Sequence, residues 1–95
     1  MKATARIYVL WAEGTSRFKV GYTSRSVGSR ALEIEAASPF PLHIVGSRTG
    51  TKADEQQIHR RLRRYRVQRE WFALPEPAVW WLVRWFGLKA PDGQI

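Results

Sequence analysis

Residues 5–23, with the sequence ARIYVLWAEGTSRFKVGYT, decide the fold because they contain two extended runs joined by a turn. The first run, ARIYVLW, is rich in β-branched and aromatic residues, and SRFKVGY is a second extended run. Such residues are typical of strands that pack one face on a core. The stretch therefore predicts a β-hairpin that turns near Glu13-Gly14.

The chain changes from strand spacing to helical spacing after the hairpin. Residues 26–37 repeat at the period of a helix, and Ser24 or Ser26 can cap its N-terminus. The sequence SPFP at 38–41 ends this helix, because proline lacks an amide hydrogen and restricts the residue before it. Residues 42–48, LHIVGSR, then predict a third strand.

Two further helices are expected in the second half. The first covers residues 52–65, with Thr51 as its N-cap and acidic residues in its first turn. Its apolar stripe consists of Ala53, Ile58, Leu62 and Tyr65. After the short aromatic segment REWFAL (69–74), a last helix covers residues 76–87, and Gly87 suits its C-cap. The stripe of this helix, typical of a helix packed on a sheet, consists of Val79, Leu82, Val83 and Phe86.

This order of elements predicts an α+β fold in one domain. We expect a small antiparallel or mixed sheet of about three strands, flanked by helices in the order β-β-α-β-α plus the C-terminal helix. A chain of 95 residues with 44% hydrophobic content buries one modest core. That core is expected over residues 5–74, followed by the helix 76–87 and a flexible tail over 88–95.

The composition narrows the classes of protein and site. The chain has no cysteine, so any metal must be held by oxygen or imidazole, and a reducing, cytoplasmic setting is expected. The apolar run from Ile7 to Ala12 is short and favours a strand over a signal peptide. No stretch reaches the roughly 18 to 20 apolar residues of a spanning helix. We therefore expect a soluble protein that does not bind a membrane.

Positive charge gives the first indication of a partner. The chain has 16 Lys+Arg against 8 Asp+Glu, a net charge of +8, and arginines crowd the stretch HRRLRRYRVQR at 59–69. Arginine's planar fork fits phosphate oxygens, and neutralised phosphates release counterions. A solvated basic helix face is the alternative, but so dense a cluster favours a nucleic acid. The expected nucleic-acid-binding residues are Arg60, Arg61, Arg63, Arg64, Arg66 and Arg69.

Several short motifs occur together in a characteristic order. Ile7-Tyr8-Val9 and Lys19-Val20-Gly21 resemble the opening hairpin of the GIY-YIG nuclease superfamily. Arg30 then matches the arginine on the following helix, and Glu55 to His59 matches a Glu-x-x-x-His arrangement. Glu70-Trp71-Phe72 resembles the Glu-Trp-Phe motif of the small phage and bacterial branch. The resemblance is specific because the whole ordered set is present, from about residue 7 to residue 74.

The resemblance implies an endonuclease that hydrolyses DNA with Mg²⁺ or Mn²⁺. It implies that Glu70 holds the metal and that Arg30 clamps the scissile phosphate. It also implies that Tyr8 is the general base, which requires a pKa lowered from about 10 by Arg30 or a metal-bound water. His59 is then expected to shuttle a proton or to position the base.

Each of these residues also has a purely structural interpretation. Glu70 could be a salt-bridge partner, Arg30 a surface arginine, Tyr8 a half-buried strand residue and His59 a structural histidine. His43 on the third strand lacks any functional context, and we expect it to be structural.

The chain departs from the family pattern within the hairpin. Arg6 stands where glycine is usual, and Lys19 replaces the first tyrosine of the second motif. Lys19 could contact phosphate, and Tyr22 could substitute as the base. These departures leave the general base open and allow for weak or lost activity.

Two other functions compete with the nuclease. A binding module could keep the fold and the basic helix without cutting DNA. Alternatively, the Trp-rich C-terminal helix (WWLVRWFGL) could dock on a partner or a membrane surface. A domain this small has little area for reading bases, so an appended domain, a dimer or a structural feature of the substrate would have to supply selectivity.

Overall fold

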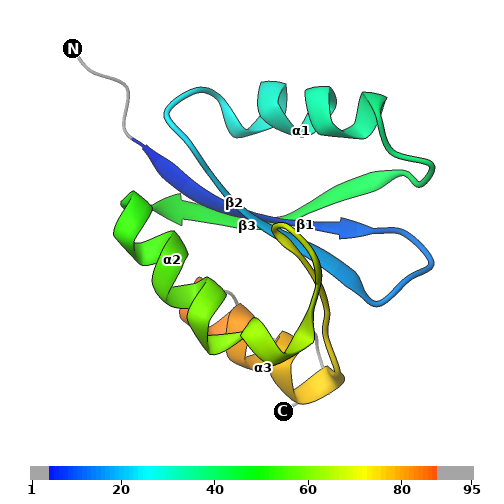
Figure 1. Cartoon of the computed structure of the whole chain (residues 1–95). Coiled ribbons are helices and arrows are strands. Elements are labelled where there is room, and N and C mark those ends of the chain that lie inside the picture. The colour runs from blue at the N-terminus through cyan, green and yellow to red at the C-terminus, as the bar shows by residue number, and fades with distance from the viewer. Residues whose placement is uncertain (1–4, 88–95) are drawn as a thin grey trace.

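The computed structural model describes residues 5–87 as an antiparallel five-stranded sheet, of order β3-β1-β2-β5-β4, with helices on both faces (Figure 1). The strands are β1 (Arg6–Ala12), β2 (Arg17–Thr23), β3 (Leu42–Thr49), β4 (Arg66–Gln68) and β5 (Trp71–Ala73). The helices are α1 (Val27–Ala36), α2 (Lys52–Arg61), the single-turn η1 (Arg63–Tyr65) and α3 (Glu76–Trp85). The α+β class is confirmed, whereas the expected tail over 88–95 lies outside the described residues.

The predicted hairpin forms the centre of the sheet. Strands β1 and β2 pair antiparallel from Arg6↔Thr23 to Trp11↔Phe18. The turn contains Gly14 at φ 79°, a conformation that glycine adopts without strain. The indole nitrogen of Trp11 donates to the carbonyl of Thr15 at 2.7 Å and fastens the turn.

The expectation of about three strands is wrong, because two short strands widen the sheet. Strand β5 is the aromatic segment of the sequence, and it pairs with β2 only from Arg17 to Lys19. Strand β4 pairs with β5 through a turn in which Arg69 adopts φ 48°. The helix predicted over 52–65 is shorter than expected. It ends at Arg61, and the single turn η1 follows it.

Helices α2 and α3 cover one face of the sheet, and α1 covers the other (Figure 1). The core lies on the α2/α3 face and consists of Ile7, Val9, Val20, Ile58, Leu62, Phe72, Leu74, Ala78, Leu82 and Phe86. Helix α1 has no buried residue. The sheet therefore has a dry face under α2 and α3 and a less densely packed face under α1.

The helix stripes agree with the sequence at four buried positions, whereas Val79 and Val83 are only partly buried and the unpredicted Ala78 is buried. Ile58, Leu62, Leu82 and Phe86 are buried as expected. Ala53 was predicted on the stripe of α2, but it is exposed and Glu55 is buried instead. At about 100° per residue, Glu55 lines up with Ile58 and Leu62, whereas Ala53 lies about 140° away from Ile58.

The three helices are short. No helix among residues 5–87 is long and apolar enough to cross a membrane.

Candidate functional site

The open half of strand β2 organises the candidate site. Strand β5 pairs with β2 only as far as Lys19, so on that side the backbone groups of Val20 bond to residues outside the strands. The amide of Val20 donates to the carbonyl of Glu70 at 3.2 Å. Its carbonyl accepts from Nε2 of His59 at 2.9 Å. One residue of β2 therefore anchors two residues that come from the β4–β5 turn and from α2.

An open groove of about 710 Å³ lies beside this strand edge. His59 and Glu70 line it, together with Glu55 and Lys52 from α2. Four of the predicted nucleic-acid-binding residues also line it: Arg60, Arg63, Arg66 and Arg69. The groove thus combines acidic side chains and an imidazole with a wall of exposed cations.

Glu70 lies at the border between the groove and the α1 face of the sheet. Its Oε1 accepts from Nζ of Lys19 at 2.8 Å, and the Glu70 side chain is 35% exposed. The Lys19 side chain is only 11% exposed, and its ammonium lies 6.0 Å from the centre of the Trp71 ring. Glu70 is therefore a salt-bridge partner in this structure, and it retains an exposed edge that can reach a cation.

Tyr8 is buried at the centre of the sheet, opposite Gly21. A Cβ at Gly21 would lie 2.3 Å from the phenol oxygen, so only glycine leaves room for the ring. Burial raises the pKa of the Tyr8 phenol above its usual value of 10.0. A hydrogen bond and the charge of Arg30 oppose this increase, whereas the carboxylates of Glu70 and Glu55 add to it.

The direction of this shift corrects the expectation of a phenol with a lowered pKa. The charge of Arg30 does lower the pKa, as expected, but desolvation outweighs it. Without a further positive charge beside it, the phenol of Tyr8 is protonated at neutral pH, and its oxygen accepts a hydrogen bond from Arg30.

Arg30 connects α1 to this cluster. Its Nη1 donates to Glu33 at 3.0 Å, and hydrogen bonds to Glu33 and Tyr8 raise its pKa. Glu33 also accepts two hydrogen bonds from Arg25. The Arg30 side chain is 39% exposed, so part of its guanidinium remains accessible. The sequence analysis missed Glu33 and Arg25, although the i,i+3 spacing of Arg30 and Glu33 was a signal for this pair.

His59 is both anchored and accessible. A carbonyl can only accept, so Nε2 carries the proton and Nδ1 is the free nitrogen of the neutral ring. The ring lies 5.2 Å from that of Phe72, centre to centre, so it also contacts the core. The structural and functional interpretations of His59 are therefore compatible.

Glu55 is a buried carboxylate that the sequence analysis did not treat as a site residue. It is 2% exposed, and its Oε1 lies 3.2 Å from Nζ of Lys52. Its Oε2 is buried without a hydrogen-bond partner among the described residues. Because buried carboxylate oxygens are usually paired, Glu55 has unused capacity to accept. The ammonium of Lys52 also lies 5.4 Å from the centre of the Tyr22 ring.

The donor set limits the kind of metal site that these residues can form. Within residues 5–87, no group of three or more histidine, aspartate or glutamate side chains could hold a metal ion. Glu70 and Glu55 supply hard oxygen donors at the same groove. This set fits Mg²⁺ in its common form, in which one or two carboxylates bind and waters and substrate phosphates complete the shell.

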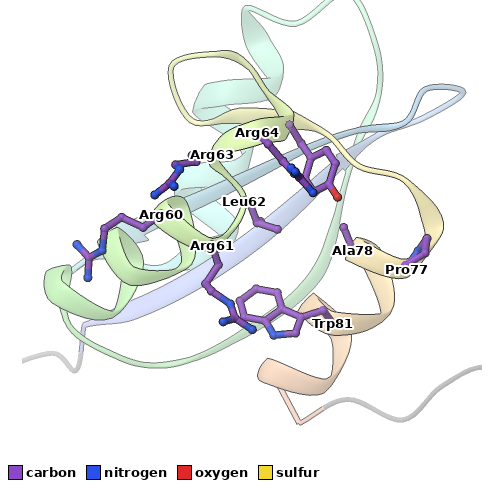
Figure 2. A pocket seen from close by; sticks show the side chains of 9 residues that line it. Arg60, Arg61, Leu62, Arg63, Arg64, Pro77, Ala78 and Trp81 are labelled. Atoms are coloured by element: carbon purple, nitrogen blue, oxygen red, sulfur yellow. The ribbon is translucent and has the colours of Figure 1, made fainter.

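The remaining predicted residues fall into clear positions. All six predicted nucleic-acid-binding arginines are exposed. Arg61 and Arg64 line a second groove next to the first, together with Trp81 (Figure 2). Arg6 donates to Ser47 and so links β1 to β3. His43 lies near the hairpin turn, where Nε2 is 2.6 Å from Glu13, away from the groove.

The comparisons with known proteins give one match. A protein-family model described as the T5orf172 domain matches residues 5–87, a span that includes every residue of the site. No curated protein and no solved structure matches the chain significantly.

Proposed function

The chain belongs to the T5orf172 domain family, and we propose that it is a metal-dependent endonuclease of the GIY-YIG type that hydrolyses phosphodiester bonds in DNA. One observation carries the proposal. Tyr8, Arg30, Lys19 and Glu70 come from β1, α1, β2 and the β4–β5 turn and meet in one cluster, which adjoins a groove walled by arginines. The known association of the family's domain with endonucleases also supports it.

Glu70 is the residue that would hold the metal, with Glu55 as the second carboxylate at the groove. When bound, Mg²⁺ or Mn²⁺ would supply positive charge to the phosphate oxygens and a water of lowered pKa. Lys19 holds Glu70 in place and balances its charge. The ion pair thus fixes the position of the carboxylate at the edge of the groove.

Arg30 would bind the scissile phosphate. Glu33 holds one side of the guanidinium, and its partial exposure leaves other N–H groups for phosphate oxygens. The protonated Tyr8 adds a donor next to it. Donors that are fixed before the substrate arrives stabilise the charge that develops on the phosphate.

The proton acceptor would have to be another group if Tyr8 remains protonated. His59 can accept a proton at Nδ1, because its Nε2 is already used by Val20. Lys19 is paired as an ammonium with Glu70 and cannot accept a proton, so Tyr22 is the second candidate. Variants of His59 and Tyr22 would decide between them, because the pH–rate profile loses its acidic limb when the residue that accepts the proton is replaced.

A DNA-binding module without catalysis is the second candidate function. The feature that favours it is the ion pair of Lys19 and Glu70, which occupies the carboxylate required for the metal. Both functions predict salt-sensitive DNA binding, so only cleavage separates them.

The test is nicking of supercoiled plasmid in Mg²⁺ or Mn²⁺ by the wild type, Glu70→Gln and Glu76→Gln. Glu76→Gln is the matched control, because Glu76 is exposed at the start of α3 and does not line the groove. We expect Glu70→Gln to lower the nicking rate at least about a hundredfold and chelation to abolish nicking. Wild-type protein that binds DNA but does not nick it would support the binding module instead.

A further inference from the structure

A second groove adjoins the catalytic one and has a different lining. It measures about 580 Å³ and lies between α2, η1 and the start of α3. Four arginines (Arg60, Arg61, Arg63 and Arg64) and two aromatic residues (Tyr65 and Trp81) line it. It therefore offers both positive charge and ring faces.

Two of the four arginines lie over the two rings of this groove. The guanidinium of Arg61 lies 5.3 Å from the centre of the Trp81 ring, and that of Arg64 lies 6.0 Å from the Tyr65 ring. Figure 2 shows Arg61 and Trp81 reaching toward each other from different helices. Flat cations and aromatic rings are the two kinds of surface on which unpaired bases stack.

The core accounts for only part of the Trp81 surface. The buried positions of α3 and its C-cap are Ala78, Leu82 and Phe86, whereas Trp81 packs against the core and remains partly exposed. Trp81 thus contributes to the interior with part of its ring and presents the rest beside the four arginines of the groove.

The two grooves are continuous through shared residues. Arg60 and Arg63 line both of them. In Figure 2 these two side chains extend away from the Arg61–Trp81 pair, on the other side of α2. A single phosphate backbone that crosses Arg60 and Arg63 would therefore connect the catalytic groove to the aromatic one.

We propose that the second groove binds an unpaired nucleotide of the DNA strand that is cut, with its base stacked on Trp81 and Arg61 and its phosphate held by Arg64. The proposal rests on the proposed function and deepens it. The substrate class is DNA that has a single-stranded flap or end beside the scissile phosphate. Bases within a duplex cover one another's faces, so only an unpaired base can use this ring.

The test compares the affinities of two fluorescently labelled DNAs by anisotropy, in EDTA so that no cleavage occurs. One is a blunt duplex and the other is the same duplex with a single-stranded flap. We expect the wild type to bind the flapped duplex at least about fivefold more tightly, which is the lower end of the stacking contribution of one base. Trp81→Ala should abolish this preference and leave the affinity for the blunt duplex nearly unchanged, whereas Trp81→Phe should retain most of it.

Two further variants keep the test decisive. Trp80→Ala is the matched control, because Trp80 is the adjacent residue of α3 and does not line the groove; it should keep the preference. Arg61→Gln changes an exposed side chain and tests the groove even if Trp81→Ala does not fold. Equal affinity of the wild type for both DNAs would overturn the proposal, and so would an equal loss for both DNAs in Arg61→Gln.

The assay separates this proposal from the proposed function. Protein that prefers the flapped DNA but never cleaves it would contradict only the nuclease. Protein that nicks plasmid but shows no preference for the flap would contradict only the nucleotide site.

Discussion

The two faces of the sheet share the same strands but differ in what they bury. Under α2 and α3 the strands bury Ile7, Val9, Val20 and Phe72 in a continuous apolar core. Under α1 the strands bury Tyr8 and Lys19 beside the apolar Leu10 and Ala12, and the helix itself contributes no buried residue. Apolar burial is the main source of stability, so the larger core under α2 and α3 contributes most of it, while the α1 face also holds polar groups in position.

This difference shows why a domain this small can contain a polar cluster. A buried polar group costs free energy unless it is paired, and Lys19 and Tyr8 find partners in Glu70 and Arg30. The substitutions below are expected to separate the two faces, from the largest expected effect to the smallest.

The largest effect is expected on the α2/α3 face. Phe72→Ala should lower the free energy of unfolding by about 3–5 kcal/mol, because Phe72 is fully buried in the core. Leu32 on α1 is 69% exposed, and Leu32→Ala should change the free energy of unfolding by less than about 0.5 kcal/mol. Urea unfolding measures both. Similar losses in the two variants would show that the faces contribute equally to stability.

An intermediate effect is expected at Gly21 on the α1 face. Gly21→Ala should lower the free energy of unfolding by about 1–3 kcal/mol and displace the Tyr8 ring from Arg30, because the added Cβ overlaps the phenol. Gly28→Ala is the control, since its Cβ would meet only Ser26 Oγ, at 3.6 Å. Thermal unfolding and plasmid nicking test the pair. A Gly21→Ala protein with wild-type stability and nicking would contradict this packing.

The smallest effect is a dependence of stability on alkaline pH. The pKa of Tyr8 is raised in the folded protein, so above about pH 10 the unfolded chain releases this proton before the folded protein does. The stability that Tyr8 contributes is therefore complete below that pH and is lost as the pH rises through the raised pKa. Urea unfolding at pH 9 and pH 11 should show a smaller decrease for Tyr8→Phe than for the wild type. An equal decrease would mean that the phenol is not desolvated.

The parts of the fold that depend on local pattern were predictable from sequence. The hairpin, α1 and the cap of α2 follow from alternation, spacing and capping residues, and Thr51 and Asp54 do form the capping box. Strand β4 was not predictable, because its three exposed residues carry no alternation and are extended only through pairing with β5. Glu55 was misjudged because a charged residue on a core stripe contradicts the usual pattern.

The members of the candidate site remain a prediction from the resemblance, and their contacts come from the structure alone. The resemblance to a nuclease family selected Tyr8, Arg30, His59 and Glu70, whose contacts with Lys19, Val20 and Glu33 emerge only from the folded chain. Lys19 and Glu70 are 51 positions apart and pair because β5 aligns with β2. No sequence spacing encodes that distance, and the shift of the Tyr8 pKa likewise depends on burial that only the structure provides.

The most direct test of the proposed nuclease compares two arginines that have the same charge and lie in different places. Arg30 contacts Tyr8 in the cluster, whereas Arg17 is exposed at the start of β2 and does not line the groove that contains His59 and Glu70. If the cluster cuts DNA, Arg30→Ala should lower the rate of plasmid nicking in Mg²⁺ at least about a hundredfold, and Arg17→Ala should leave it nearly unchanged. Equal rates in the two variants would contradict the proposal, because arginine would then contribute only through general attraction for DNA.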